Sequence, residues 1–213
     1  MKKIKVRIKF VEEALGSSPA DEEIYKKFIA TKSPDASTLE DEVAAVGVDK
    51  ALENAMTVYP KTAHGKEFVP FIWDYQIRGY FKEVCGIEKK IPGMESNGIS
   101  AHKKLIDNYV FVTPRQIPLD LHGAKMGVCE RALRAQTAQG ERNALAASES
   151  VPEGTTAEFT VQLMIEKEPA KKDKPGVDYV KALTEWLDYG IYKGFGQWRN
   201  SGKGRFTYEI IES

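Results

Sequence analysis

The stretch from residue 190 to residue 211 combines residue types that are suited to binding a phosphate chain. Glycines recur through its first fifteen residues, at Gly190, Gly194, Gly196, Gly202 and Gly204. Cations and aromatic residues lie among them: Lys193, Arg199, Lys203 and Arg205, with Tyr192, Phe195 and Trp198. Because glycine has no Cβ, its backbone N–H groups can approach a phosphate closely, while cations add charge and rings offer stacking faces. The combination favours single-stranded nucleic acid, although glycines between a helix and a strand can also simply turn the chain.

Two periodic segments must hold this stretch in place. Residues 177–189 have helical spacing, with apolar residues that should face inward at Val180, Leu183, Trp186 and Leu187. Residues 205–211 alternate as a strand does. The sequence therefore predicts a helix, a glycine-rich loop and a final strand in that order.

Two further segments alternate strictly and predict half-buried strands. In residues 2–11 one face carries Ile4, Val6, Ile8 and Phe10, and the other carries Lys3, Lys5, Arg7 and Lys9. Residues 158–165 place Phe159, Val161, Leu163 and Ile165 on one face. We expect both strands in one sheet. The row of four cations could bind a phosphate chain, but such a row is more often a solvated face or protects an edge strand.

The region from residue 12 to residue 58 has helical composition and predicts an insertion after the first strand. Ser18-Pro19 resembles a helix start with proline at the first position. A second predicted helix begins at Ser37 or Thr38 and carries acidic residues in its first turn.

A third helix should follow the short apolar segment 68–72, with Asp74 as its N-cap and Ile77, Phe81 and Val84 on its buried face. Arg78 falls on the opposite side of this helix. Gly79 weakens the helix by about 1 kcal/mol relative to alanine, and close approach of another backbone would explain it.

Residues 127–150 lack large apolar side chains, which leaves little for them to bury. Arg131, Arg134 and Arg142 flank a tip of small residues around Gly140. The composition is typical of a helix, and a long hairpin is the alternative. In either form we expect residues 127–150 to project from the body as a mobile arm.

Taken together, the elements predict one α+β domain over residues 1–213, with an antiparallel sheet and helices on one face. Acidic and basic residues number 31 each, so anion binding must come from a local patch. No apolar run is long enough to span a membrane, and the N-terminus lacks the apolar region of a signal peptide. The two cysteines lack CxxC spacing and the three histidines lack ligand spacing, so we expect a cytoplasmic protein without metal or cofactor.

Three segments resemble, in the same order, motifs of the RAMP superfamily, the backbone subunits of CRISPR effectors. Residues 194–206 resemble its glycine-rich loop, and residues 151–161 resemble its Val-Pro-x-Gly-Thr segment, with 131–149 at the position of its β-hairpin thumb. Residues 68–81 resemble the entry to its first helix. The family's Gly-Ser-Ser there is replaced by Ile72, Trp73 and Asp74, and its basic residue by Gln76.

This resemblance implies a ferredoxin-like, RRM-type core with a thumb, which binds guide RNA and stacks head to tail or with other effector subunits. We therefore expect a non-catalytic subunit that binds single-stranded RNA in preference to DNA. The cations expected to contact phosphates are Arg78, Arg131, Arg134, Arg142, Lys193, Arg199, Lys203 and Arg205. Trp198 or Phe195 would stack on a base, and Gly194 and Gly196 would shape the loop.

Two alternatives remain open. The first is a metal-independent endoribonuclease with His64 or His102 as its base, although we find no nuclease motif. The second is a phage-encoded protein that mimics a backbone subunit and caps or inhibits a CRISPR effector, which the neutral net charge favours.

Overall fold

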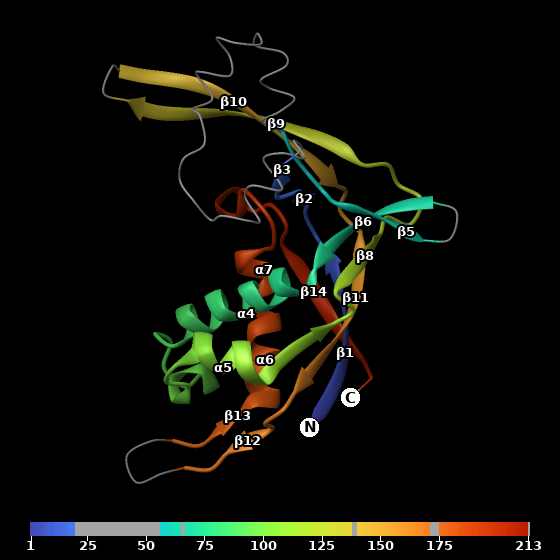
Figure 1. Ribbon diagram of the computed structural model, residues 1–213. Coiled ribbons are helices and arrows are strands. Elements are labelled where there is room, and N and C mark those ends of the chain that lie inside the picture. The colour runs from blue at the N-terminus through green and yellow to red at the C-terminus, as the bar shows by residue number, and fades with distance from the viewer. Residues whose placement is uncertain (20–55, 65–66, 138–139, 171–174, 213) are drawn as a thin grey trace.

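A computed structural model describes residues 1–19, 56–64, 67–137, 140–170 and 175–212 of the chain (Figure 1). Its core sheet runs in the order β14-β1-β11, with β7 on the far side of β11. The bounds of these strands are β1 Lys2–Phe10, β7 Val110–Thr113, β11 Thr156–Leu163 and β14 Phe206–Glu212. All three pairings between them are antiparallel.

Two helices complete the connections between these strands. In chain order the unit is β1, α4 (Asp74–Glu88), β7, β11, α6 (Tyr179–Asp188) and β14. This is a βαββαβ unit whose strands lie in the spatial order fourth, first, third, second. That order is the ferredoxin-like arrangement, and the predicted α+β fold is confirmed.

The strict alternation in β1 places one face of the strand under the helices. Ile4, Val6, Ile8 and Phe10 are all buried. In the register of the sheet, Ile4 lies opposite Val161 and Val6 opposite Phe159 of β11. The two strands predicted to share a sheet therefore do so, and their apolar residues meet on the same face.

The helices cover that single face of the sheet (Figure 1). The predicted inward residues Ile77, Phe81 and Val84 of α4 and Leu183, Trp186 and Leu187 of α6 are all buried. Val180, also predicted to face inward, is only partly buried. Asp178 caps α6 by accepting hydrogen bonds from the N–H groups of Val180 and Lys181. The layer also contains α5 (His102–Tyr109), α7 (Gly190–Lys193) and the short helix η1 (Glu95–Gly98). None of the described helices is both long and apolar enough to cross a membrane.

A long hairpin extends beyond the body at the top of Figure 1. It consists of β9 (Gly127–Thr137) and β10 (Gly140–Val151), which pair antiparallel. The base of β10 also pairs with β2 (Ala14–Leu15) and β4 (Thr57–Val58), and β4 pairs with β3 (Ser18–Pro19). From β11 the core sheet continues through β8 (Gln116–Asp120), β6 (Glu67–Trp73) and β5 (Lys61–His64). A separate small ladder joins β12 (Lys167–Glu168) to β13 (Val177–Asp178).

The hairpin resolves the choice left open for residues 127–150. Residues 127–137 and 140–150 form two strands, so the helix suggested by their composition is wrong, because each strand finds its hydrogen-bond partner in the other. Ser18 and Pro19 are likewise in a strand and not in a first helical turn, since they pair with Thr57 and Val58. Residues 20–55, which include the second predicted helix of the insertion, lie outside the described residues.

Two details of α4 also differ from expectation. Trp73, and not Asp74, is the residue before the helix, and its backbone N–H donates to the Gln76 side chain at 2.8 Å. Gly79 is exposed, and a Cβ added there would meet nothing within 4 Å. Close approach of another residue that the structure describes is therefore not the reason for the glycine.

Candidate nucleic-acid interface

The glycine-rich loop folds onto itself and onto the segment that follows β1. The Phe195 N–H donates to the Gly204 carbonyl, and the Gly204 N–H donates to the Glu13 carbonyl, both at 2.8 Å. A Cβ added at Gly194 would lie 2.5 Å from the Lys203 carbonyl oxygen, and one added at Gly204 would lie 1.8 Å from that of Phe195. Both glycines have positive φ. Close internal packing thus requires Gly194 and Gly204. The N–H groups of Phe195 and Gly204 already donate to carbonyls, so they are not free to bind a phosphate.

Gly196 is required for a similar reason. It has a φ of 86°, and an added Cβ would lie 2.7 Å from the carbonyl oxygen of Leu15 in β2. The loop is therefore pressed against the strand that pairs with the base of the hairpin. This packing brings the loop and the hairpin to the same place.

Three of the four loop cations are held by carboxylates from other elements. Lys193 lies 2.9 Å from Glu83 of α4, and Arg199 pairs with the same carboxylate. Lys203 pairs with Glu13. Burial raises the pKa of Glu83, but hydrogen bonds from Arg199 and Lys193 outweigh it and leave that pKa below its ordinary value. The hydrogen bond from Lys203 likewise lowers the pKa of Glu13.

Arg205 differs from the other three. Its side chain is exposed, and that side chain makes no ion pair or hydrogen bond with any other residue that the structure describes. Its guanidinium carbon would lie 3.3 Å from a Cβ added at Gly202. Arg205 therefore offers an available positive charge at the end of the loop.

The hairpin meets the loop through Arg131 and Trp198. The Arg131 guanidinium lies over the Trp198 ring, 5.3 Å from its centroid, and donates to the Gln197 side chain at 2.9 Å. It also donates to the Ser148 hydroxyl of β10 at 3.2 Å. Trp198 has left-handed backbone geometry, and its side chain is 39% exposed. One face of the indole carries the cation–π contact with Arg131, and the exposed part of the ring can stack on a base.

The remaining predicted residues are not gathered at this contact. Phe195 is buried in the core, so its ring cannot stack on a base in this conformation. Arg78 lies on α4, 3.5 Å from Asp74. Arg134 and Arg142 lie farther along the hairpin, opposite Asn143 and Ala135 in the register of β9 and β10.

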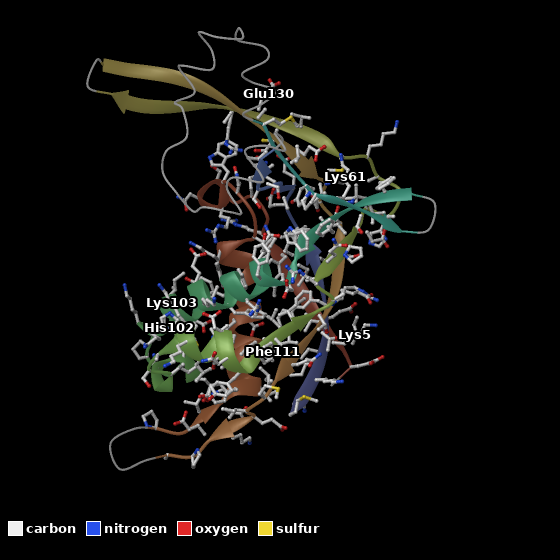
Figure 2. All side chains as sticks on the ribbon, in the orientation of Figure 1. Lys5, Lys61, His102, Lys103, Phe111 and Glu130 are labelled. Carbon is white, nitrogen blue, oxygen red and sulfur yellow. The ribbon has the colours of Figure 1, made fainter. Side chains whose placement is uncertain are left out.

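The outer face of β1 carries the other row of cations. Arg7 donates to Glu158 of β11 at 2.7 Å and also pairs with Glu209 of β14, and Lys5 lies 3.3 Å from Glu158. Figure 2 shows Lys5 on the side of the sheet away from the helices. The centre of this row is therefore neutralised by carboxylates of the two neighbouring strands.

The histidines proposed as bases do not join the loop. His102 lies on α5 beside Lys103, in the helical layer and away from the hairpin (Figure 2). Burial, with Lys89 and Lys103 nearby, lowers its pKa. The backbone of His64 lies in β5. Within the described ranges, no group of three or more His, Cys, Asp or Glu residues could hold a metal ion.

One histidine contact was not foreseen from the sequence. His122 lies 3.0 Å from the Thr156 hydroxyl and 3.4 Å from the Asp120 carboxylate. The three residues line a cleft of about 710 Å³ that also contains Arg7 and Lys9. The side chains of His122 and Asp120 are both more than half exposed, so solvent screens their interaction.

Comparison with known proteins gives little direct guidance. No family model matches the chain, and no curated protein sequence matches it. Among solved structures, a chain described as "Type IV-B CRISPR Complex" is similar over 100% of this chain and 91% of its own length. The TM-score is 0.48, and 11% of residues are identical.

Proposed function

We propose that this chain is a non-catalytic subunit that binds single-stranded nucleic acid, RNA in preference to DNA, in the manner of a RAMP backbone subunit. Residues 1–213 would form one such domain, with the β9–β10 hairpin as its thumb. Its partners would be other copies or the subunits of a CRISPR-like effector, in the cytoplasm.

The observation that carries the proposal is the contact between Arg131 and Trp198. It joins the hairpin, whose arginines were expected to contact phosphates, to the glycine-rich loop, whose composition suggested binding of a phosphate chain. An exposed indole beside a guanidinium suits a base next to its phosphate, because the ring stacks and the cation attracts the charge. Arg205 adds an exposed cation from the same loop.

Binding at such a site would depend weakly on sequence. Every base offers a π-face to Trp198, and every phosphate carries the same charge. Phosphate contacts release counterions, so the affinity should fall steeply as salt rises. The neutral net charge of the chain means that this dependence would come from the local cations alone.

One alternative has a specific observation in its favour. Lys193, Arg199 and Lys203 already hold carboxylates, which reduces the local field that a phosphate chain would meet. A protein that only mimics a backbone subunit, and caps or inhibits an effector, would need no such field. Binding measurements separate the two hypotheses.

The test compares the parent with Arg199→Ala combined with Arg205→Ala, using fluorescence anisotropy with labelled single-stranded RNA and DNA over a range of salt. Each lost phosphate contact should reduce the salt slope by about 0.7. The matched control is Lys103→Ala combined with Lys104→Ala on α5, which removes the same charge from exposed positions in the helical layer. If the loop variant folds and binds as the parent does with an unchanged slope, the mimic hypothesis replaces this one.

A further inference from the structure

A stack of side chains lies at the start of α4, outside the residues that the sequence predicted as nucleic-acid contacts. The rings of Trp73 and Tyr75 are stacked at 6.0 Å with 15° between their planes. The Arg115 guanidinium lies over the Trp73 ring, 5.7 Å from its centroid, and Phe71 packs edge-on against that ring at 4.8 Å. Trp73 is thus held from several directions, and it fixes the plane of Tyr75.

Tyr75 presents this ordered ring to solvent. Its side chain is 49% exposed, although it stacks on a half-buried tryptophan. The carbonyl of Arg115 accepts the N–H of Asp74 at 2.9 Å, which ties the stack to the first turn of the helix. Because the ring is already held in place, stacking of a flat partner on it costs the protein little conformational entropy.

The exposed side of α4 connects this ring to the glycine-rich loop. Tyr75, Gly79 and Glu83 are spaced four residues apart, so they follow one side of the helix over about 12 Å. Glu83 holds Lys193 and Arg199 of the loop at one end of this stripe. Gly79 has no side chain to cover the middle of the stripe, and no atom of the described part of the chain lies within 4 Å of a Cβ added there.

These observations also account for a glycine that weakens the helix. An exposed glycine in a helix interior destabilises the helix relative to alanine, and no residue described in the structure needs the space. A ligand backbone lying against the helix would need it. The stripe has cations on its flanks at Arg78 and Arg115, which matches a phosphate chain better than an apolar partner.

We propose that α4 extends the nucleic-acid path, with Tyr75 as a second stacking position for a base and Gly79 as the place where the strand crosses the helix. This inference rests on the proposed function. The strand would run from the cations of the loop, over Gly79, to the ring of Tyr75. The path is long enough for a few nucleotides, so strands of different length should distinguish its two ends.

The first experiment compares Tyr75→Ala with Tyr75→Phe, measured by anisotropy with labelled single-stranded RNA. Loss of the ring should weaken binding about tenfold with the salt slope unchanged, because stacking releases no counterion. Tyr75→Phe retains the ring and should bind within about twofold of the parent. The loss should appear with long strands and disappear with the shortest strands that the loop still binds.

The second experiment uses Gly79, where stability and binding should change in opposite directions. Gly79→Leu should raise the melting temperature by about 2–4 °C, since leucine favours the helix. It should weaken RNA binding about tenfold, because its side chain occupies the strand's position. A variant that only loses stability, or that binds as the parent does, would overturn the path over α4.

The outcomes separate this inference from the proposal beneath it. If the Arg199 and Arg205 variant weakens binding while Tyr75→Ala and Gly79→Leu do not, the loop binds the strand and the path over α4 is wrong. If the parent binds no single strand at all, the proposed function fails as well. If Tyr75→Ala instead abolishes capture of a protein partner, the stripe is a protein interface.

Discussion

The outer face of β1 and the junction of loop and hairpin both carry a row of cations, yet they differ in how those charges are used. On β1 the register of the sheet sets Arg7 opposite Glu158 and Glu209, and no aromatic ring of the described residues makes a cation–π contact with Arg7. At the junction Arg131 lies over an exposed indole, and Arg205 has no partner among the described residues. The number of cations in a segment therefore does not predict available positive charge, because pairing depends on the strands and helices alongside.

The largest difference between the two surfaces should appear on removing two cations from each. Arg131→Ala combined with Arg205→Ala should weaken binding of single-stranded RNA by about a hundredfold, since charge-assisted hydrogen bonds are lost and Trp198 loses its support. Lys3→Ala combined with Lys9→Ala removes the same charge from exposed positions of β1 and should leave the affinity within about twofold. Anisotropy titrations measure both, with circular dichroism to confirm folding. Equal losses from the two surfaces would mean that binding follows overall charge.

Trp198 tests the aromatic part of the junction. Trp198→Ala should weaken RNA binding about tenfold while the salt slope stays constant, because a stacked base contributes about 1–3 kcal/mol without releasing counterions. The side chain is 39% exposed, so the melting temperature should change little. A large fall in melting temperature would show that the ring holds the loop in place, and the affinity loss would then say nothing about stacking.

The alternation in β1 and β11 made the core of the fold predictable, because a period of two is visible in the local sequence. The sequence did not decide between a helix and a hairpin for residues 127–150. Alanine, arginine and glutamate favour a helix, and the strands form only because β9 and β10 pair with each other. The short strands β2 and β3 were missed for the same reason. Their partners Val151 and Thr57 are distant in the sequence.

The candidate site was predicted residue by residue but not as an arrangement. Arg131 and Trp198 were both proposed, yet nothing in the sequence indicated that one lies over the other. Glu83 and Glu13 were not considered, although they decide which loop cations remain available. The glycines correctly indicated unusual backbone, but the approach of Gly204 to Phe195 shows that internal packing, and not a ligand, is what requires it.

A smaller change should follow from releasing cations instead of removing them. Glu83→Gln leaves Lys193 and Arg199 without their carboxylate, so the affinity for single-stranded RNA should rise about threefold with a steeper salt slope. Glu158→Gln releases Lys5 on β1 and leaves Arg7 paired with Glu209 alone, and it should change neither quantity. The two variants are compared side by side by anisotropy over a range of salt. A rise for Glu158→Gln equal to that for Glu83→Gln would remove the distinction between the surfaces.

The smallest expected effect is on stability, where the two surfaces should behave alike. Hydrogen bonds from Arg7 and Lys5 lower the pKa of Glu158, and those from Arg199 and Lys193 lower that of Glu83 despite its burial. A carboxyl whose pKa is lower in the folded state stabilises the fold above its unfolded pKa and loses that contribution as the pH falls through the folded pKa. Both carboxylates are more than a third exposed, so solvent screening should limit each pair to less than about 1 kcal/mol.

Urea unfolding of Glu83→Gln and Glu158→Gln should therefore show small losses at pH 7, and these losses should shrink in acid as the parent's own carboxylates become protonated. A loss at Glu83 well above that at Glu158 would mean that Glu83 mainly anchors the loop. The gain in RNA affinity expected for Glu83→Gln would then be offset by a loop that no longer holds Trp198 against Arg131, and the two measurements together would identify which role dominates.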